Sequence, residues 1–444
     1  MGFFKFLAVV CVYLQVMSVF WITNIPTCSA EIRDSKIDSD SRPMILFEKF
    51  GFTHRGHVQI LVSDVFFKAT QAAPDLDPSQ MGFFLLTDEG LVQVLVELEQ
   101  ETHYCVFSSH FIKPLFNFKQ QDASLNYNYS YPITDPNEYS LFFANCHHQY
   151  QVSMNVHTEM YNMEGDVKDF LPAGQTQLPK LYFCFFLLYL AFLGLWIYVC
   201  VKQRLTVHRI HVLMCALLLL KALNLVCEAE DKSYVKTYGT AHGWDIAFYI
   251  FGFFKGIMLF TLIVLIGTGW SFLKPYLQER EKKVLMIVIP LQVFANIASI
   301  VIDETGPSTK DWFTWQQAFL LIDIICCCAI IFPIVWSIKT LRETSKTDGK
   351  AARNLAKLTL FRQFYIVVVS YLYFTRIVVY ALTTVTAYKY KWVSNCAEEA
   401  VSLAFYIFIF YKFQPVDKNP YFVIDDEEEE AVALATLRDE DFDI

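Results

Sequence analysis

Six ionisable residues lie inside long apolar stretches of the chain, where a charge is expensive to keep. They are Lys221, Lys255, Asp323, Arg376, Glu398 and Glu399. Within a membrane helix such residues mark ligand or ion pathways, or pair with one another. Three cations and three carboxylates at similar depth therefore predict one of two arrangements. They line a water-filled cavity open to the lumenal side, or they form internal pairs, for example Lys255 with Asp323, that orient helices and bind nothing. Glu398 and Glu399 favour the cavity, because adjacent residues on a helix cannot share one pairing direction.

The sequence contains no complete set of catalytic or metal-binding residues at a recognisable spacing. The histidines that come closest to one lack a carboxylate or a partner histidine at a suitable spacing; these are His147, His148, His157, His208 and His211. Nucleophile-elbow, zinc-protease and phosphate-loop motifs do not occur in the sequence. The sequence therefore predicts a protein that is not an enzyme and that carries no metal and no cofactor.

Composition places the chain in a membrane. Of its 444 residues 55% are hydrophobic and only 18% charged, and the net charge is -9. Soluble chains carry about 25% charged residues. Much of the negative charge comes from one acidic run at 425–430, and no basic block occurs, so nucleic acid is not an expected partner.

Seven stretches are long and apolar enough to cross a membrane, which takes about 20 residues. They span roughly 180–201, 207–227, 244–269, 284–302, 312–338, 359–386 and 393–412. The first, third and fifth connecting loops carry 13 lysines and arginines, and the second, fourth and sixth carry five. Because cytosolic loops concentrate positive charge, the odd loops are expected in the cytosol. We predict an all-α seven-helix bundle at 180–412 and an acidic cytosolic tail at 413–444.

The N-terminal 30 residues read as a signal peptide. Lys5 precedes an apolar run at 6–22, and Ala30 ends a segment suited to signal peptidase. The alternative is an uncleaved first membrane helix, but the charged, serine-rich sequence that follows at 31–42 favours cleavage. The chain is then expected to enter the secretory pathway with its N-terminal region in the lumen.

Residues 31–179 are expected to form a lumenal β-sandwich. Apolar and polar residues alternate at 151–160, and the segments 57–67 and 91–98 look like further strands. Turn signals separate the strands at 74–78, 88–90 and 135–137. Cys105 and Cys146 are the segment's two cysteines, which suggests one disulfide in an oxidising lumen, worth about 3–4 kcal/mol. Asn128 heads the one N-glycosylation sequon of this segment.

The helical region resembles a known family. The motifs that carry the resemblance follow one another from the third span to the end of the seventh: LIGTGWSF at 265–272, IPLQVFAN at 289–296, IFPIVWSI at 331–338, NLAKL at 354–358, YFTR at 373–376 and YKFQP at 411–415. They are similar to those of the GOLD-domain seven-transmembrane family, also called lung seven-transmembrane receptors. The likeness covers about 180–425 and is nearest to the Golgi-associated orphan-receptor branch, whose plant members are called candidate G-protein coupled receptors.

The resemblance implies a GOLD-like β-sandwich above a seven-helix bundle. It also implies residence in the Golgi, trans-Golgi network or endosomes, and a part in membrane trafficking. No catalytic residues come with it. Among the cavity candidates only Arg376 lies in a family-like motif, and the lumenal segment matches the family in class and position alone.

The tail carries a sorting-signal pattern. Tyr421 and Ile424 fit the tyrosine-x-x-bulky form that binds a clathrin adaptor as an extended strand. The alternative is a disordered, solvated tail. The pattern lies about ten residues beyond the last span and runs into the acidic cluster.

Three classes of function follow from these features. The first is trafficking or cargo handling, with a lumenal cargo or ligand bound by the sandwich. The second is a receptor that couples to G proteins through its basic loops. The third is a lipid-binding or ion-conducting bundle that uses the charged cavity. The acidic-Arg-Tyr and Asn-Pro-x-x-Tyr switch motifs of rhodopsin-like receptors do not occur in helices three and seven, which favours the first class.

Overall fold

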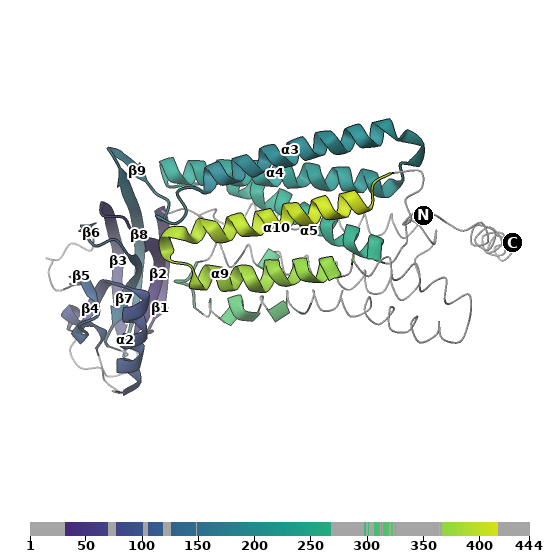
Figure 1. Cartoon of the computed structure of the whole chain (residues 1–444). Helices are drawn as coiled ribbons and strands as arrows, with labels where there is room; N and C mark the ends of the chain where they lie inside the picture. The colour runs from purple at the N-terminus through teal and green to yellow at the C-terminus, as the bar shows by residue number, and fades with distance from the viewer. Residues whose placement is uncertain are drawn as a thin grey trace, which may run out of the picture.

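The computed structural model describes residues 32–69, 77–100, 105–118, 126–147, 149–267 and 366–415. It also describes the isolated positions 297–298, 301, 306–310, 312, 314–318, 321–322, 325 and 364. Within these residues an N-terminal β-sandwich lies at one end of a bundle of helices that run side by side away from it (Figure 1). The predicted signal peptide, most of the fourth and fifth spans, and the tail beyond 415 lie outside the described residues.

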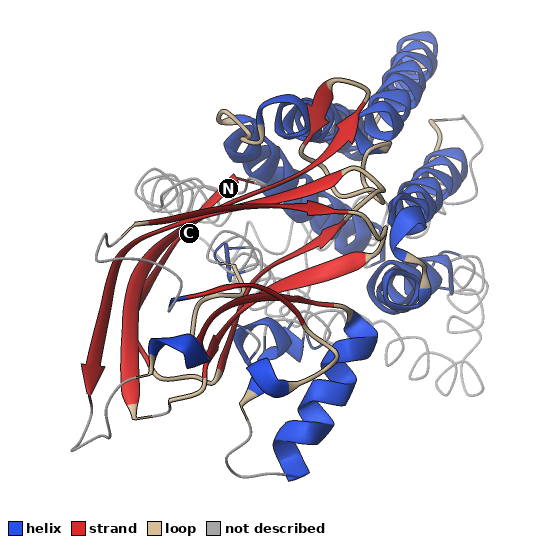
Figure 2. Ribbon diagram, turned by 90° about the vertical axis from the view of Figure 1, so that its left-hand side faces the viewer, coloured by secondary structure: helices blue, strands red, loops and turns tan. Residues whose placement is uncertain are grey.

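The sandwich has two antiparallel sheets. The first contains β1 (Ile32–Asp40), β8 (Tyr150–Glu164), β3 (Gly56–Ala69) and β6 (Tyr127–Ile133) in that order, with β9 (Val167–Asp169) paired to β8. The second contains β2 (Met44–Gly51), β7 (Glu138–Asn145), β4 (Met81–Leu86) and β5 (Lys113–Asn117). Figure 2 shows the two sheets stacked face to face, and aromatic and branched side chains fill the space between them.

The alternation predicted at 151–160 is confirmed on β8. Val152, Met154, Val156, Thr158 and Met160 are all buried, while their neighbours along the strand are partly exposed. Successive side chains of a strand point to opposite faces, so this pattern places one face of β8 in the core. The segment at 57–67 is likewise a strand, within β3.

The prediction of a strand at 91–98 is wrong. This segment belongs to helix α2 (Asp88–Gln100), and the expected turn at 88–90 is its first turn. Thr87 Oγ1 accepts a hydrogen bond from the Gly90 N–H at 3.2 Å, as an N-cap does. Leu91, Val94 and Leu98 follow helical spacing and pack with the outer face of the second sheet, which α2 covers in Figure 2. Short apolar runs do not separate strand from helix, which explains the error.

The sandwich carries one disulfide. It joins Cys105, five residues after the end of α2, to Cys146, directly after β7, with 5.1 Å between the Cα atoms. The bridge ties the chain that leaves α2 to the sheet that the helix covers.

The bundle contains α3 (Leu178–Lys202), α4 (Arg209–Tyr238), α5 (Trp244–Gly267) and α10 (Lys391–Lys412). It also contains α9 (Val379–Val385), which continues from a π-helical turn at Phe374–Val378. Four helices in the described part are long and apolar enough to cross a membrane, in the first, second, third and last predicted spans. Helix α4 runs past the predicted end at 227 to Tyr238, where Gly239 adopts a left-handed conformation (φ 75°) and ends it.

The sandwich and the segment that follows it contact the bundle at three places at one end. Phe170 N–H donates to the Lys236 carbonyl oxygen at 3.1 Å, and Trp392 N–H donates to the Gly174 carbonyl oxygen at 2.9 Å. Arg42 reaches the segment at 306–310. These places fall in the second, sixth and fourth loops of the predicted topology, although Lys236 and Trp392 belong to helices α4 and α10 in the structure. The three basic-poor segments therefore share an end with the N-terminal domain, and the side of the membrane that this end faces stays a prediction.

Candidate functional site

A buried ion pair joins two helices in the middle of the bundle. Lys221 of α4 and Glu399 of α10 approach each other twice, with Nζ 2.8 Å from Oε1 and 2.7 Å from Oε2. Only 4% of the Lys221 side chain and 11% of the Glu399 side chain are exposed. The Lys221 ammonium also lies 5.6 Å from the centroid of the Tyr189 ring on α3. The buried ammonium of Lys221 on α4 therefore contacts both α10, through Glu399, and α3, through Tyr189.

Lys255 of α5 takes a neutral partner. Its Nζ donates to Oδ1 of Asn224 at 2.7 Å, and the Asn224 amide donates in turn to the Phe248 carbonyl oxygen at 3.1 Å. Lys255 also interacts electrostatically with Glu228, Glu398 and Glu399. The amide of Asn224 thus holds the ammonium of Lys255 beside the buried pair, with carboxylates of two helices around it.

The structure therefore brings together four of the six predicted cavity residues: Lys221, Lys255, Glu398 and Glu399. Asp323 and the side chain of Arg376 lie outside the described residues, so the pairing of Lys255 with Asp323 stays a prediction. Of the two arrangements expected from the sequence, Lys221 and Glu399 adopt the internal ion pair. Glu399 has its partner, and its neighbour Glu398 interacts electrostatically with Lys255.

Sequence reasoning missed three polar residues of α4. Lys221, Asn224, Glu228 and Asp231 are spaced by three, four and three positions, which places them on one face of a helix. The predicted span ended at 227, so Glu228 and Asp231 were assigned to a loop. The same 3–4 spacing, continued beyond the apolar run as far as Gly239, would have found them.

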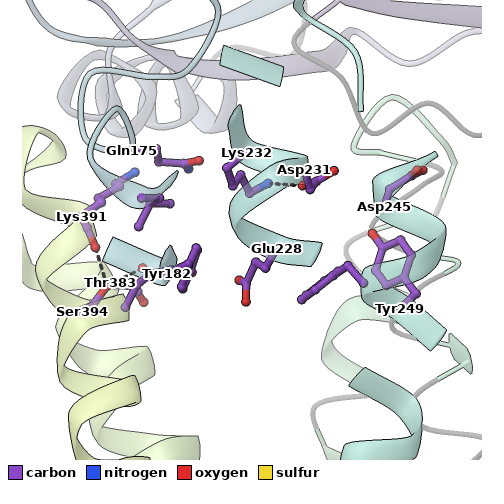
Figure 3. A pocket seen from close by; sticks show the side chains of 13 residues that line it. Gln175, Tyr182, Glu228, Asp231, Lys232, Asp245, Tyr249, Thr383, Lys391 and Ser394 are labelled. Atoms are coloured by element: carbon purple, nitrogen blue, oxygen red, sulfur yellow. Dashed lines mark hydrogen bonds and ion pairs between the residues drawn. The ribbon is translucent and has the colours of Figure 1, made fainter. Parts of the chain in front are cut away.

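A pocket of about 390 Å³ opens at the end of the bundle that faces the sandwich. It lies between α4, α5, α10 and the start of α3, and Figure 3 shows side chains from these helices around it. The charged residues of its lining are Glu228, Asp231, Lys232, Asp245 and Lys391. Its aromatic residues are Tyr182, Phe248 and Tyr249. Glu228 interacts electrostatically with Lys221, Lys255 and Glu399. The pocket therefore borders the buried charged residues in the middle of the bundle.

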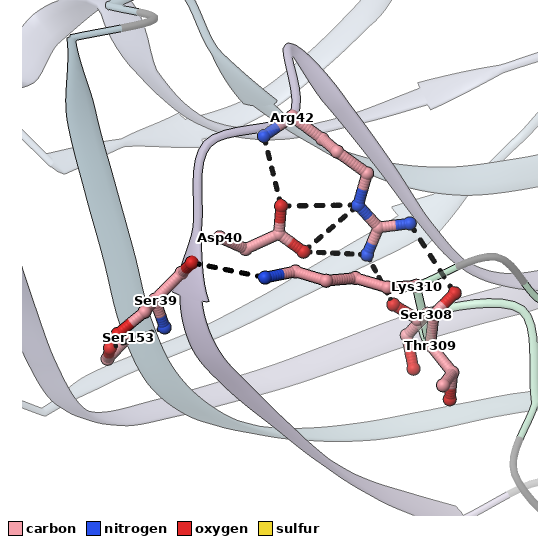
Figure 4. Close-up of polar contacts among 7 residues, drawn as sticks. All are labelled: Ser39, Asp40, Arg42, Ser153, Ser308, Thr309 and Lys310. Carbon is pink, nitrogen blue, oxygen red and sulfur yellow. Dashed lines mark hydrogen bonds and ion pairs between the residues drawn. The ribbon is translucent and has the colours of Figure 1, made fainter.

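A polar clamp holds the sandwich to the fourth loop, as Figure 4 shows. The Arg42 guanidinium contacts both carboxylate oxygens of Asp40, with its Nη2 2.7 Å from Oδ2, and donates to the Ser308 carbonyl oxygen at 2.6 Å. Lys310 donates back to the Ser39 carbonyl oxygen at 3.2 Å. Burial alone would raise the pKa of Asp40, but the hydrogen bonds and charge of Arg42, with the charge of Lys310, outweigh it and lower the pKa.

Two further contacts join the sandwich to the bundle. Together with the contact of Arg42 to the fourth loop, they form the interface between the two domains that we call the seam. Lys391, at the start of α10, pairs with Glu138 of β7, which also pairs with Lys49 at 3.1 Å. Lys236, near the end of α4, lies 3.4 Å from Asp169 of β9. Burial raises the pKa of Asp169 and outweighs the Leu171 N–H and the Lys236 charge, which act to lower it. The seam therefore holds one carboxylate that favours its charged form and one that is penalised for it.

The remaining predicted sites have simpler surroundings. Asn128 is exposed on the edge strand β6, where a glycan has room, and its occupancy stays a prediction. His211 is buried; its Nε2 contacts the Phe413 carbonyl oxygen at 3.0 Å and its Nδ1 accepts from the His208 N–H at 2.8 Å. Nε2 thus joins α4 to the end of α10, and Nδ1 caps the start of α4 itself. Among the described residues no group of three His, Cys, Asp or Glu side chains could hold a metal ion. Tyr421 and Ile424 lie outside those residues.

Comparison with known proteins covers nearly the whole chain. Residues 33–162 match the family model described as CAND6/7, N-terminal domain, and residues 177–420 match that of the GOST seven transmembrane domain. A protein of Arabidopsis thaliana named candidate G-protein coupled receptor 6 is 53% identical over 433 residues, which are 97% of this chain and 98% of the relative.

Proposed function

The chain belongs to the GOST family of multi-pass membrane proteins, and from this premise we propose that it acts in membrane trafficking at the Golgi, the trans-Golgi network and endosomes. In this proposal the sandwich handles a lumenal cargo, the bundle anchors it, and the cytosolic tail engages coat adaptors. The enzyme classes are set aside, since the family is not one of enzymes by name.

The three-point seam is the observation that carries the proposal. The sandwich is fixed to the bundle through Arg42, Glu138 and Asp169, which contact the fourth loop, α10 and α4 respectively. The connecting segment is held as well, because Ala173 N–H donates to the Gly51 carbonyl oxygen at 2.9 Å. At Gly174 a Cβ would collide with the Tyr388 carbonyl oxygen, so only glycine allows this approach. A cargo on a domain seated in this way keeps a set position relative to the membrane and the tail.

Sorting through the tail can be tested by substitution. Tyr421→Ala and Ile424→Ala remove the two side chains that an adaptor would bind. We expect both variants to move from Golgi and endosomal membranes to the cell surface, as judged by fluorescence imaging of the tagged protein. Tyr276→Ala is the matched control, because Tyr276 is in a predicted cytosolic loop with Glu279, not an apolar residue, three positions on. Unchanged residence of both tail variants would contradict adaptor binding.

Cargo handling needs a separate experiment. In cells that lack the protein, pulse-chase labelling of secreted glycoproteins should show delayed transit for a subset, and the wild-type chain should restore it. A chain with Arg42→Ala and Glu138→Gln, which loosens the seam at two points, should restore transit poorly even when it reaches the same compartment. Normal transit in the absence of the protein would overturn the trafficking proposal.

Signalling to a G protein is the second candidate. The polar pocket favours it, because a ligand placed there would contact α4, α5 and α10 next to the pair that joins α4 to α10. The Arabidopsis relative is named a candidate receptor of this kind. Nucleotide exchange on purified G-protein α-subunits, measured with and without fractionated ligands, separates the two functions. Ligand-dependent exchange would favour signalling over trafficking.

A further inference from the structure

Two carboxylates of the pocket are buried and incompletely partnered. Asp231 of α4 is 6% exposed and Asp245 of α5 is 4% exposed. Within the described part of the chain, Oδ1 of each makes no hydrogen bond. Asp231 has one cation nearby, Lys232, whose Nζ is 3.4 Å from its other oxygen. The two acids also interact with each other, as like charges do. Buried charges are ordinarily paired, so this arrangement leaves room for a cation.

The lysines of the lining do not fill that place. Lys391 points its ammonium to Glu138 of the sandwich, and Lys232 contacts only one oxygen of Asp231. Figure 3 shows Asp245 and Tyr249 on α5 across from Glu228 and Asp231 on α4. A helix N-terminus favours an acid and accounts for part of the placement of Asp245 in the first turn of α5. Asp231, well inside α4, has no such explanation.

The walls of the pocket suit an organic cation better than a metal ion. Phe248 and Tyr249 flank the acidic side, and aromatic faces attract ammonium groups. A metal site would need three or more donors together, and no such group occurs among the described residues. The volume of about 390 Å³ lies within the range of small-molecule pockets.

We propose that this pocket binds an organic cation with a protonated amine, held between Asp231 and Asp245 and covered by Phe248 and Tyr249. The ammonium donates to the two free carboxylate oxygens, and the apolar part of the ligand packs on the aromatic rings. Such an amine belongs either to a soluble small molecule or to the headgroup of a membrane lipid. The site stands on its own geometry and does not depend on the trafficking proposal.

Titration calorimetry on the purified full-length chain in detergent tests the site, with 2-phenylethylamine as probe and 2-phenylethanol as its neutral counterpart. We expect saturable binding of the amine and none of the alcohol. Asp231→Asn and Asp245→Asn keep side-chain shape but remove one charge each, and each should weaken amine binding by about tenfold or more. Asp166→Asn, at an exposed position of the sandwich, is the matched control and should leave binding unchanged.

Thermal unfolding guards against a variant that simply fails to fold. Without probe, the two Asn variants should unfold no earlier than the wild type, because each removes one of two buried carboxylate charges that repel each other. With probe, only the wild type and Asp166→Asn should gain thermal stability. Equal binding of amine and alcohol by the wild type, or unchanged amine binding by both Asn variants, would overturn the proposal.

The source of the amine is decided in lipid nanodiscs. If lipids with an ethanolamine headgroup compete with 2-phenylethylamine and lipids with a glycerol headgroup do not, the natural ligand is a lipid headgroup. If neither lipid competes, it is a soluble amine. Either result supports the site only where Asp245→Asn has lost amine binding.

Discussion

Asp40 at the seam and Asp245 in the pocket are almost equally buried, with 3% and 4% of their surface exposed, yet their surroundings differ. Both oxygens of Asp40 accept from the Arg42 guanidinium, and one also accepts from the Arg42 backbone N–H at 3.0 Å. Asp245 has an oxygen without a hydrogen bond among the described residues and a like-charged neighbour in Asp231. Burial alone therefore does not reveal the role of a carboxylate. Its partners separate an acid that holds domains together from one that is available to a ligand.

The Lys221–Glu399 pair extends this contrast into the bundle and should give the largest effect. Lys221→Met leaves the Glu399 carboxylate buried without its cation, which costs about 3–5 kcal/mol. We expect a large fall in the unfolding temperature of the detergent-solubilised protein. Adding Glu399→Gln to Lys221→Met should restore much of the loss, because no unpaired charge then remains. Lys68→Met, at an exposed position, is the control. A loss no greater than that of the control would show that the pair does not stabilise the bundle.

Removing the cation at the seam should cost less. Arg42→Ala strands Asp40 and cuts the contact with Ser308, and charge-assisted hydrogen bonds of this kind are worth about 2–3 kcal/mol. Amide hydrogen exchange measured by mass spectrometry should become faster in β1 and in the segment at 306–310. Arg55→Ala, which removes an exposed arginine of the same domain, should leave both segments unchanged. Unaltered exchange in Arg42→Ala would place the stability of the seam elsewhere.

The pocket acids should respond in the opposite direction. Asp231→Asn removes one of two facing charges and should raise the free energy of unfolding by about 1 kcal/mol in the absence of an amine. Chemical denaturation in detergent measures the change, and Asp166→Asn again serves as the control. A destabilisation as large as that expected for Arg42→Ala would mean that the contact with Lys232 is enough to stabilise the Asp231 charge inside the protein.

Lowering the pH should change the stabilities contributed by Asp40 and Asp169 in opposite directions, and we expect these changes to be the smallest of those predicted. The lowered pKa of Asp40 means that its stabilisation is complete above about pH 4 and is lost as the pH falls through its folded-state pKa. The raised pKa of Asp169 gives the reverse sign. Its charged form is penalised at neutral pH, and the penalty is relieved as the pH falls through the raised pKa toward about 4.

Unfolding temperatures of the wild type, Asp40→Asn and Asp169→Asn between pH 3 and 7 test both signs. The difference between wild type and Asp40→Asn should shrink only at the acidic end of the series. The difference between wild type and Asp169→Asn should change at higher pH, in favour of the wild type as acid is added. Parallel curves for the two variants would contradict the assignment.

The sequence was sufficient where one local pattern decides the structure. The alternation at 151–160 identified β8 and its buried face, and the apolar spans located α3, α5 and α10 to within a few residues. The strand prediction failed at 91–98, where an apolar run of strand length forms a helix. One face of this helix packs on the second sheet, and the opposite face is exposed to solvent. The outer face of the second sheet, which this helix covers, exists only in the folded domain, so the apolar run alone does not reveal it.

The site was less accessible to prediction for a different reason. The polar stripe from Lys221 to Asp231 can be read from spacing on one helix. Its partners come from elsewhere: Asp245 faces it from the next helix, and Glu399 is 178 positions from Lys221. The seam contact of Arg42 is to a backbone carbonyl oxygen, at Ser308, which no side-chain pattern marks. Residue types predicted that charges would be buried, and only the fold shows which of them meet.

The most direct test is a paired comparison of Asp40→Asn and Asp245→Asn by thermal unfolding, with and without 2-phenylethylamine. We expect Asp40→Asn to unfold at a lower temperature than the wild type and to keep its stabilisation by the amine. Asp245→Asn should unfold no earlier than the wild type and should lose that stabilisation. If Asp245→Asn is destabilised as much as Asp40→Asn and still responds to the amine, the two carboxylates play the same structural role and the contrast between seam and pocket is wrong.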